Sequence, residues 1–125
     1  MKFLFILSFL LSTNAFTQEG VFVDPETPPE FPGGESGLSM WISENLRYPQ
    51  DAIEKGLTGK CYVSFIVDSN GICKDFKIIK GVRDCPSCDE EVLRLVKSMP
   101  KWKPGLVGEK PAAMSYKFPI NFRLN

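Results

Sequence analysis

Two cysteines in the segment Cys85-Pro86-Ser87-Cys88 are the residues of this chain best placed for covalent chemistry. A Cys-x-x-Cys pair at the start of a helix can have a lowered thiol pKa, which turns one thiol into a nucleophilic thiolate. The chain contains no histidine, so the commonest general base and metal ligand is absent. A small thiol–disulfide protein that uses Cys85 and Cys88 is therefore the enzymatic hypothesis that the residue types allow.

The surroundings of this cysteine pair do not favour the enzymatic hypothesis. No pattern for a parallel strand–helix–strand unit precedes the pair, although thioredoxin-type proteins place their motif near such a unit. The cysteines at positions 61, 73, 85 and 88 also lack the two Cys-x-x-Cys pairs of a zinc ribbon. We therefore predict a protein that is not an enzyme, with no catalytic residue, no metal site and no cofactor.

Two longer helices are predicted by apolar residues at helical spacing. In the first, Leu38–Leu46, apolar residues recur at i, i+3, i+4 and i+8. Tyr48-Pro49 ends this helix, because the residue before a proline avoids the α region, and Gln50–Lys55 forms a further helical turn. The second longer helix begins at Ser87–Glu90, which has the form of a capping box, and stops before Pro100.

Three strands are predicted in the rest of the chain. Lys60–Asp68 and Ile72–Lys80 flank Asn70-Gly71, a strong signal for a hairpin turn. Gly105–Pro111 is predicted to be a loop. In Met114–Leu124, apolar and polar residues alternate strictly, as in a half-buried strand. This order of elements predicts an α+β domain with two helices packed on a three-stranded antiparallel sheet.

Residues 1–17 have the layout of a secretory signal peptide. Lys2 follows Met1, a hydrophobic run covers Phe3–Leu11, and short polar residues come next. The run is about half the roughly 20 residues that span a bilayer as a helix. We predict cleavage after Thr17, with cleavage after Ala15 or an uncleaved membrane anchor as alternatives. The folded part then lies outside the cytoplasm, as a domain of residues 35–125 behind a Pro-rich linker of residues 18–34.

An exported chain can form disulfide bonds. With Asn70-Gly71 as the turn, Cys61 and Cys73 lie at opposite ends of the hairpin, so they are too far apart for a bridge. We predict that Cys61 pairs with Cys85 or with Cys88, and that Cys73 is free.

The charges are balanced overall, with a formal net charge of zero, which does not favour nucleic acid as a partner. Their distribution is uneven, because residues 94–125 hold seven basic residues and one acidic residue. This basic third is either a mixed solvated surface or a weakly positive face that steers acidic peptides toward the domain.

Several short segments after residue 28 form a specific combination. They are Pro29-Glu30-Phe31-Pro32-Gly33-Gly34, Tyr48-Pro49, Val63-Ser64-Phe65-Ile66-Val67-Asp68 with Asn70-Gly71, Cys88-Asp89-Glu90-Glu91, Ser98-Met99-Pro100-Lys101-Trp102-Lys103-Pro104-Gly105 and Phe118-Pro119-Ile120-Asn121-Phe122-Arg123-Leu124. Together they resemble the TonB C-terminal domain family, in the form found in Bacteroidetes. The resemblance extends to the C-terminus.

The resemblance implies a domain whose last strand grips the TonB box, an extended segment of an outer-membrane TonB-dependent receptor, by β-strand addition. It implies a periplasmic role in transmembrane transport. In a complete TonB of this family, the inner-membrane motor ExbB/ExbD supplies the energy. The short hydrophobic run and the short linker do not favour energy transduction by this chain alone. No small-molecule substrate is expected, and the same edge also allows a homodimer.

The resemblance places the binding site on the last strand. Pro119 supports an edge position, because proline within a sheet is confined mainly to edge strands. Trp102 is predicted to cap the core beneath the second helix rather than to stack on a ligand. The predicted peptide-binding residues are Ser115, Tyr116, Lys117, Phe118, Ile120, Asn121 and Arg123.

Overall fold

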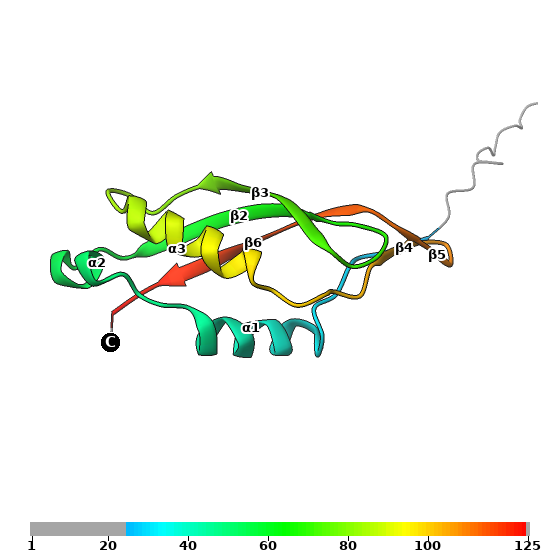
Figure 1. The fold of residues 1–125 in the computed structure, drawn as a ribbon, viewed down its shortest axis with the longest axis horizontal. Helices are drawn as coiled ribbons and strands as arrows, with labels where there is room; N and C mark the ends of the chain where they lie inside the picture. Colours follow the sequence, from blue (N-terminus) through cyan, green and yellow to red (C-terminus); the bar gives the residue numbers. More distant parts are fainter. Residues whose placement is uncertain (1–24, 125) are drawn as a thin grey trace, which may run out of the picture.

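The computed structural model describes residues 25–124, so the predicted signal peptide and the start of the predicted linker lie outside this range. The elements, shown in Figure 1, are β1 (Glu26–Thr27), α1 (Gly34–Asn45), α2 (Gln50–Lys55), β2 (Gly59–Val67), β3 (Cys73–Lys80), α3 (Pro86–Lys97), β4 (Gly105–Val107), β5 (Lys110–Ala112) and β6 (Met114–Phe122). Within the described residues, no helix has both the length and the apolar composition that crossing a membrane requires.

The main sheet has three antiparallel strands in the order β3-β2-β6. β2 and β3 form the hairpin predicted around Asn70-Gly71, and β6 pairs with the other side of β2. The ladder between β2 and β6 runs without a shift from Gly59↔Phe122 to Val67↔Met114. The predicted fold class is confirmed: the domain is α+β, with helices packed on a three-stranded antiparallel sheet.

The hairpin turn is held by one carboxylate and one glycine. Asp68 Oδ1 accepts hydrogen bonds of 2.9 Å from the N–H groups of Ile72 and Asn70, which lowers the pKa of Asp68. Gly71 has a φ of 84°, and an added Cβ there would lie 2.1 Å from the carbonyl oxygen of Trp102. A residue with a side chain therefore cannot replace Gly71 unless the segment carrying Trp102 moves.

Helices cover only one face of the main sheet. Buried and more exposed residues alternate along β2, and α3 packs on the buried side. The buried residues of the largest core cluster include Cys61, Val63, Cys88, Val92, Leu95, Val96, Ile120 and Phe122. We call the opposite side of the sheet the open face, because its residues in the described chain are exposed or half-buried.

An aromatic cluster joins the segment before α1 to the main sheet. Phe31 is 6% exposed and its ring lies 5.6 Å from that of Trp102, which in turn lies 5.4 Å from Phe65. Beside them, Glu30 and Lys103 exchange two backbone hydrogen bonds, of 3.0 and 2.8 Å. The predicted boundary between linker and domain, at residue 35, thus falls inside the packed structure, and Trp102 lies in the core as predicted.

Two local predictions are wrong. Gly105–Pro111, predicted to be a loop, contains β4 and part of β5, which form a small second sheet with β1 in the order β1-β4-β5. Cys85, rather than Ser87, caps α3, and its sulfur accepts a hydrogen bond of 3.2 Å from the N–H of Cys88. The Ser87 hydroxyl instead donates a hydrogen bond of 2.8 Å to Asp51.

A buried carboxylate ties α3 to the end of α1. Glu91 is 9% exposed and accepts a hydrogen bond of 2.7 Å from the N–H of Arg47. The guanidinium of Arg94 donates two more to it, of 2.7 and 2.6 Å, and a third of 3.0 Å to the carbonyl of Asn45. Burial acts to raise the pKa of Glu91, but the hydrogen bonds from Arg94 and Arg47 outweigh it, so the pKa lies below its ordinary value.

Replacing Glu91 with glutamine is expected to lower the free energy of unfolding at neutral pH by about 1–3 kcal/mol, because charge-assisted hydrogen bonds are lost. A carboxylate whose pKa is lowered by folding stabilises the protein above its unfolded-state pKa. That stabilisation disappears as the pH falls through the folded-state pKa, so the difference between the two proteins should shrink in acid. Urea unfolding at neutral and acidic pH measures this difference in the free energy of unfolding. Glu90→Gln, at an exposed neighbour, is the control, and a loss for Glu91→Gln that is independent of pH would contradict the prediction.

Candidate functional site

β6 is an edge strand of the main sheet in the described part of the chain. β2 pairs with one side of it along all nine residues, and none of the described strands pairs with the other side. Such an edge presents a row of N–H and C=O groups to which another extended chain can pair. The row is about 30 Å long, at 3.3–3.4 Å per residue.

Pro119 indicates which backbone groups of β6 point to the free edge. In an antiparallel pair, residues bonded to the neighbouring strand alternate with residues whose N–H and C=O point away. Proline has no N–H and is tolerated in a sheet where that group would not join the ladder. Since the ladder is unshifted at Tyr62↔Pro119, we expect the outward groups to belong to Ser115, Lys117, Pro119 and Asn121, and all of these except Pro119 offer an N–H.

The side chains of the predicted site residues divide between the two faces of the sheet. Those on the face covered by helices are Tyr116, Phe118 and Ile120. Those on the open face, all exposed, are Ser115, Lys117 and Asn121. Ile120 is 1% exposed, so only its backbone is accessible to a partner. Arg123 follows the last residue of β6 and lies outside the ladder with β2.

Two hollows adjoin the first residues of β6. Their volumes are about 310 and 420 Å³, and they share Pro28, Pro29 and Tyr116 as walls. The first is also lined by Leu38 and Lys103, and the second reaches Met114 at the start of β6. A strand added to this edge would project alternate side chains toward the face on which Tyr116 lies. Sequence reasoning missed both hollows, because Pro28, Pro29 and other lining residues come from the segment predicted to be a linker.

Tyr116 is positioned by the buried Trp102. The two rings meet edge to face, with centroids 4.8 Å apart. Trp102 is 3% exposed, and its indole N–H has no hydrogen-bond partner among the described residues. Burial, with a smaller contribution from the Glu35 carboxylate, raises the pKa of Tyr116. Its phenol therefore stays neutral and gives the edge a hydrogen-bonding group beside apolar walls.

The disulfide differs from the predicted pairing. Cys85 and Cys88 are bonded to each other, so the predicted bond from Cys61 to either of them is wrong. The first turn of α3 brings the Cα atoms of Cys85 and Cys88 within 5.3 Å, whereas pattern reasoning had kept both available to Cys61. Cys73 is a free thiol, as predicted, and Cys61 is free as well.

The burial of the sulfurs does not favour thiol–disulfide chemistry. Cys85 is 1% exposed and Cys88 is 0% exposed, while exchange requires a thiolate that can reach a disulfide sulfur. Burial, followed by the charge of Asp89, raises the pKa of the Cys61 thiol to about 12. Burial likewise raises the pKa of Cys73, to about 11. Neither free cysteine has the lowered pKa of a reactive thiol.

Comparison with known proteins identifies the family. The model of the Gram-negative bacterial TonB protein C-terminal family matches residues 44–124. A solution structure of the Helicobacter pylori TonB-CTD is 26% identical with a TM-score of 0.51, and the match covers 70% of this chain and 89% of that one. The Pseudomonas aeruginosa TonB CTD has a similar fold, with 24% identity, a TM-score of 0.51 and coverage of 62% and 77%. A search of curated proteins finds no match. The chain belongs to the family of Gram-negative bacterial TonB C-terminal domains.

Proposed function

We propose that this domain binds the TonB box of an outer-membrane TonB-dependent receptor by adding the box as a fourth strand beside β6. The observation that carries the proposal is the free edge of β6, whose other side is fully paired with β2. Membership of the TonB C-terminal family supports the choice of partner. The function is thus peptide binding linked to transmembrane transport, with no catalysis by the domain.

Main-chain hydrogen bonds supply the affinity in this mode of binding, and side-chain hollows supply the selectivity. The expected donors on the free edge are the N–H groups of Ser115, Lys117 and Asn121, and Pro119 leaves a gap in the row. The hollows around Tyr116 accept apolar side chains of the bound segment. Lys117, exposed on the open face, and Arg123, beyond the end of β6, attract carboxylates of the partner.

The proposal places the domain in the periplasm, in keeping with its family and with the predicted signal in residues 1–17. Residues from Glu26 onward already belong to β1 and the packed domain, so only residues 18–25 of the predicted linker precede the first strand. In this proposal the domain is a binding module for receptor segments.

The test is a titration of the isotope-labelled protein with a synthetic TonB-box peptide, followed by backbone amide NMR. We expect the largest shifts at the outward positions of β6 and at the residues that line the hollows, above all Tyr116. The control is the same peptide with N-methyl groups at alternate residues, which removes the donors on one of its edges. Shifts that avoid β6, or none with millimolar peptide, would refute strand addition.

The edge of β6 can also pair with a second copy of the chain. Light scattering over a range of protein concentrations, with and without the peptide, separates the two uses of the edge. Under the proposal the peptide binds a monomer, or dissociates a dimer that uses the same edge. A dimer that persists in saturating peptide would show that the two partners use different surfaces.

A further inference from the structure

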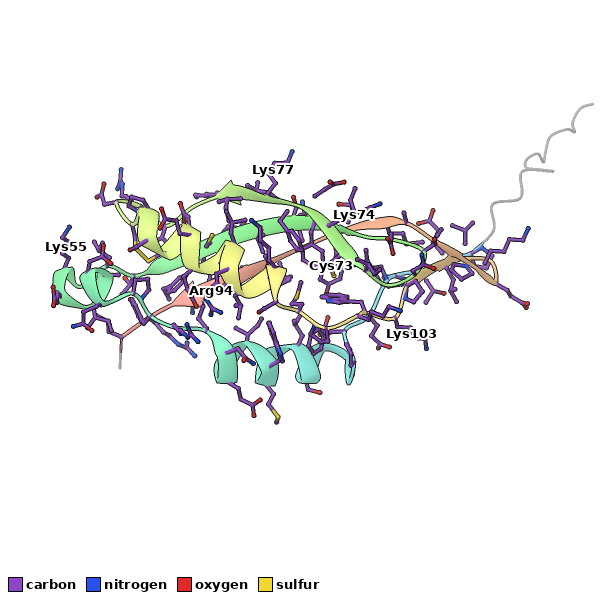
Figure 2. All side chains as sticks on the ribbon, in the orientation of Figure 1. Lys55, Cys73, Lys74, Lys77, Arg94 and Lys103 are labelled. Atoms are coloured by element: carbon purple, nitrogen blue, oxygen red, sulfur yellow. A yellow bond between two sulfur atoms is a disulfide. The ribbon has the colours of Figure 1, made fainter. Side chains whose placement is uncertain are left out.

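Lysines gather on the open face of the main sheet. Lys74, Lys77 and Lys80 of β3 lie opposite residues of β2 that share this face, as does Lys117 of β6, and Lys60 belongs to the same row of β2. The register pairs are Ile66↔Lys74, Ser64↔Lys77, Tyr62↔Lys80, Ser64↔Lys117 and Lys60↔Asn121. Directly opposed residues of an antiparallel pair point to the same side. In Figure 2, Lys74 and Lys77 lie on the side of the domain away from α1.

Two register shifts in β3 produce this arrangement. Lys74 and Lys77 are three positions apart, as are Lys77 and Lys80, whereas their partners on β2 are two positions apart. Each extra residue is a β-bulge, and Asp75 at one of them has a φ of 58°. A bulge changes the side to which the following residues point. All three lysines of β3 therefore face the same way.

Acidic residues are absent from the paired positions of the open face in the described strands. Two carboxylates flank the face, at the hairpin turn (Asp68) and at the bulge (Asp75). A third, that of Asp89 on α3, accepts a hydrogen bond of 3.0 Å from the N–H of Val82, just after the end of β3. Most of the described carboxylates lie on the helices, namely Glu35, Glu44, Asp51, Glu54, Asp89, Glu90 and Glu91. The chain has no net charge. Its charges are nevertheless distributed unevenly, with lysines on the open face and most of the described carboxylates on the helices.

A third hollow, of about 570 Å³, lies at one end of the open face. Lys60 and Lys80 line it together with Arg83 and Tyr62, and none of its lining residues is acidic. The three cations and the Tyr62 hydroxyl offer hydrogen-bond donors to an anionic group. Arg83 adds a planar guanidinium, which suits the oxygens of a phosphate.

We propose that the open face docks on an anionic phospholipid membrane, with a lipid phosphate seated in the hollow between Lys60, Lys80 and Arg83. The five lysines spread over three strands, and Lys74 and Lys80 lie opposite residues four positions apart on β2, a distance of about 13 Å. This spread matches a flat, distributed negative surface better than one small anion. Tyr62, on the open face, is 37% exposed, and Ile79, the extra residue at the bulge beside it, is 53% exposed. Such apolar and amphipathic groups favour the boundary between headgroups and acyl chains.

This docking does not rest on the proposed peptide function. It uses one face of the sheet, whereas the peptide pairs with the backbone edge of β6, so a docked domain keeps that edge accessible. Of the described residues assigned to the two surfaces, the side chain of Lys117 belongs to both. The consequence is an orientation, in which the helical layer points away from the membrane and a bound segment lies parallel to the membrane surface.

The test is co-sedimentation of the full exported chain with vesicles of phosphatidylglycerol and phosphatidylcholine, compared with vesicles of phosphatidylcholine alone. We expect binding to the anionic vesicles that weakens with added salt. The triple variant Lys74→Gln, Lys77→Gln, Lys80→Gln should bind about a hundredfold more weakly, at roughly fivefold per lysine near an anionic surface. These residues are exposed, so the fold is expected to survive, and circular dichroism checks this.

The matched control is the triple variant Lys55→Gln, Lys97→Gln, Lys110→Gln, which removes the same charge from exposed sites on α2, α3 and β5. Both variants keep the same residues before β1, so any contribution of that segment to membrane binding cancels. Equal loss in the two variants, or equal binding to both kinds of vesicle, would overturn the proposal. If inorganic phosphate displaces the protein from the vesicles more than chloride of equal ionic strength does, the ligand of this face is a small anion and the membrane proposal is wrong. If a DNA oligonucleotide displaces the protein preferentially, the ligand is nucleic acid.

Peptide binding, measured without vesicles, is expected to be unchanged in the β3 triple variant. Loss of vesicle binding with intact peptide binding would support membrane docking through the open face, whether or not the peptide proposal is correct. Intact vesicle binding in this variant would refute the docking face and leave the peptide proposal untouched.

Discussion

Replacing Trp102 with alanine is expected to lower the free energy of unfolding by about 3–5 kcal/mol, the usual cost of removing a large buried aromatic side chain. The indole ring is 3% exposed and meets the rings of Phe31, Phe65 and Tyr116. Its loss leaves a cavity where the segment before α1, the main sheet and the hairpin turn come together. Because small domains are stable by only about 5–15 kcal/mol, the change is a large part of the total. Urea unfolding followed by circular dichroism measures it.

Trp41, the other tryptophan of the chain, provides the matched control. It is half-buried on α1 and contacts Phe31 at a centroid distance of 5.8 Å. Trp41→Ala removes the same volume from a site that solvent can partly fill, so its cost should be clearly smaller. Similar losses for the two variants would show that Trp102 has no special place in the core.

Replacing Pro119 with alanine is expected to tighten binding of a TonB-box peptide by about 2–10-fold. The variant restores an N–H at the centre of the free edge, and one net hydrogen bond contributes about 0.5–1.5 kcal/mol. Isothermal titration calorimetry measures the change. The same variant should associate with itself more readily, because an edge proline also discourages unwanted pairing.

The opposite change at the neighbouring outward position should have the opposite effect. Lys117→Pro removes an expected outward donor and should weaken peptide binding by a similar factor. Lys117→Gln, which keeps the N–H and removes the charge, separates the backbone effect from electrostatic attraction. If Lys117→Pro instead unfolds the domain, its N–H belongs to the ladder with β2, and the assignment of outward groups is wrong.

Features that depend on neighbouring residues could be predicted from the sequence. The turn at Asn70-Gly71 needs a left-handed glycine, and Gly71 has that conformation. The strict alternation of Met114–Leu124 fixes which side chains of β6 are buried, because the side-chain period of a strand is two. Tyr48-Pro49 follows the end of the first helical region, as predicted. The Tyr48 hydroxyl donates a hydrogen bond to the carbonyl of Leu57.

Features that depend on distant segments could not be predicted. The pairing of β1 with β4 joins residues about 80 positions apart in the chain, and neither strand is long enough to show a periodicity. The burial of Phe31 requires Trp102 as a partner, and the Pro-rich composition around Phe31 is typical of a linker. The two hollows beside β6 form only because that segment packs there.

The lysines of the open face show that an irregular backbone can prevent a shared face from being predicted from the sequence. A regular strand of period two would place Lys74 and Lys77 on opposite faces. The bulges of β3 reverse this expectation and align them. The sequence drew attention to the basic residues after Arg94 instead, although only Lys117 among those lies at a paired position of the open face.

The packing of Phe31 on Trp102 also has a mechanical consequence. A pulling force applied from the N-terminal side reaches the domain first at the pairing of β1 with β4, and then at the two hydrogen bonds between Glu30 and Lys103 and at the buried ring of Phe31. The load then passes from Trp102 into the central strand through Phe65, rather than peeling α1 away from its end. A segment held along β6 would resist the same pull in shear, with its hydrogen bonds loaded together. The N-terminal side of the domain and the candidate binding edge are thus connected through the packed rings of Phe31, Trp102 and Phe65.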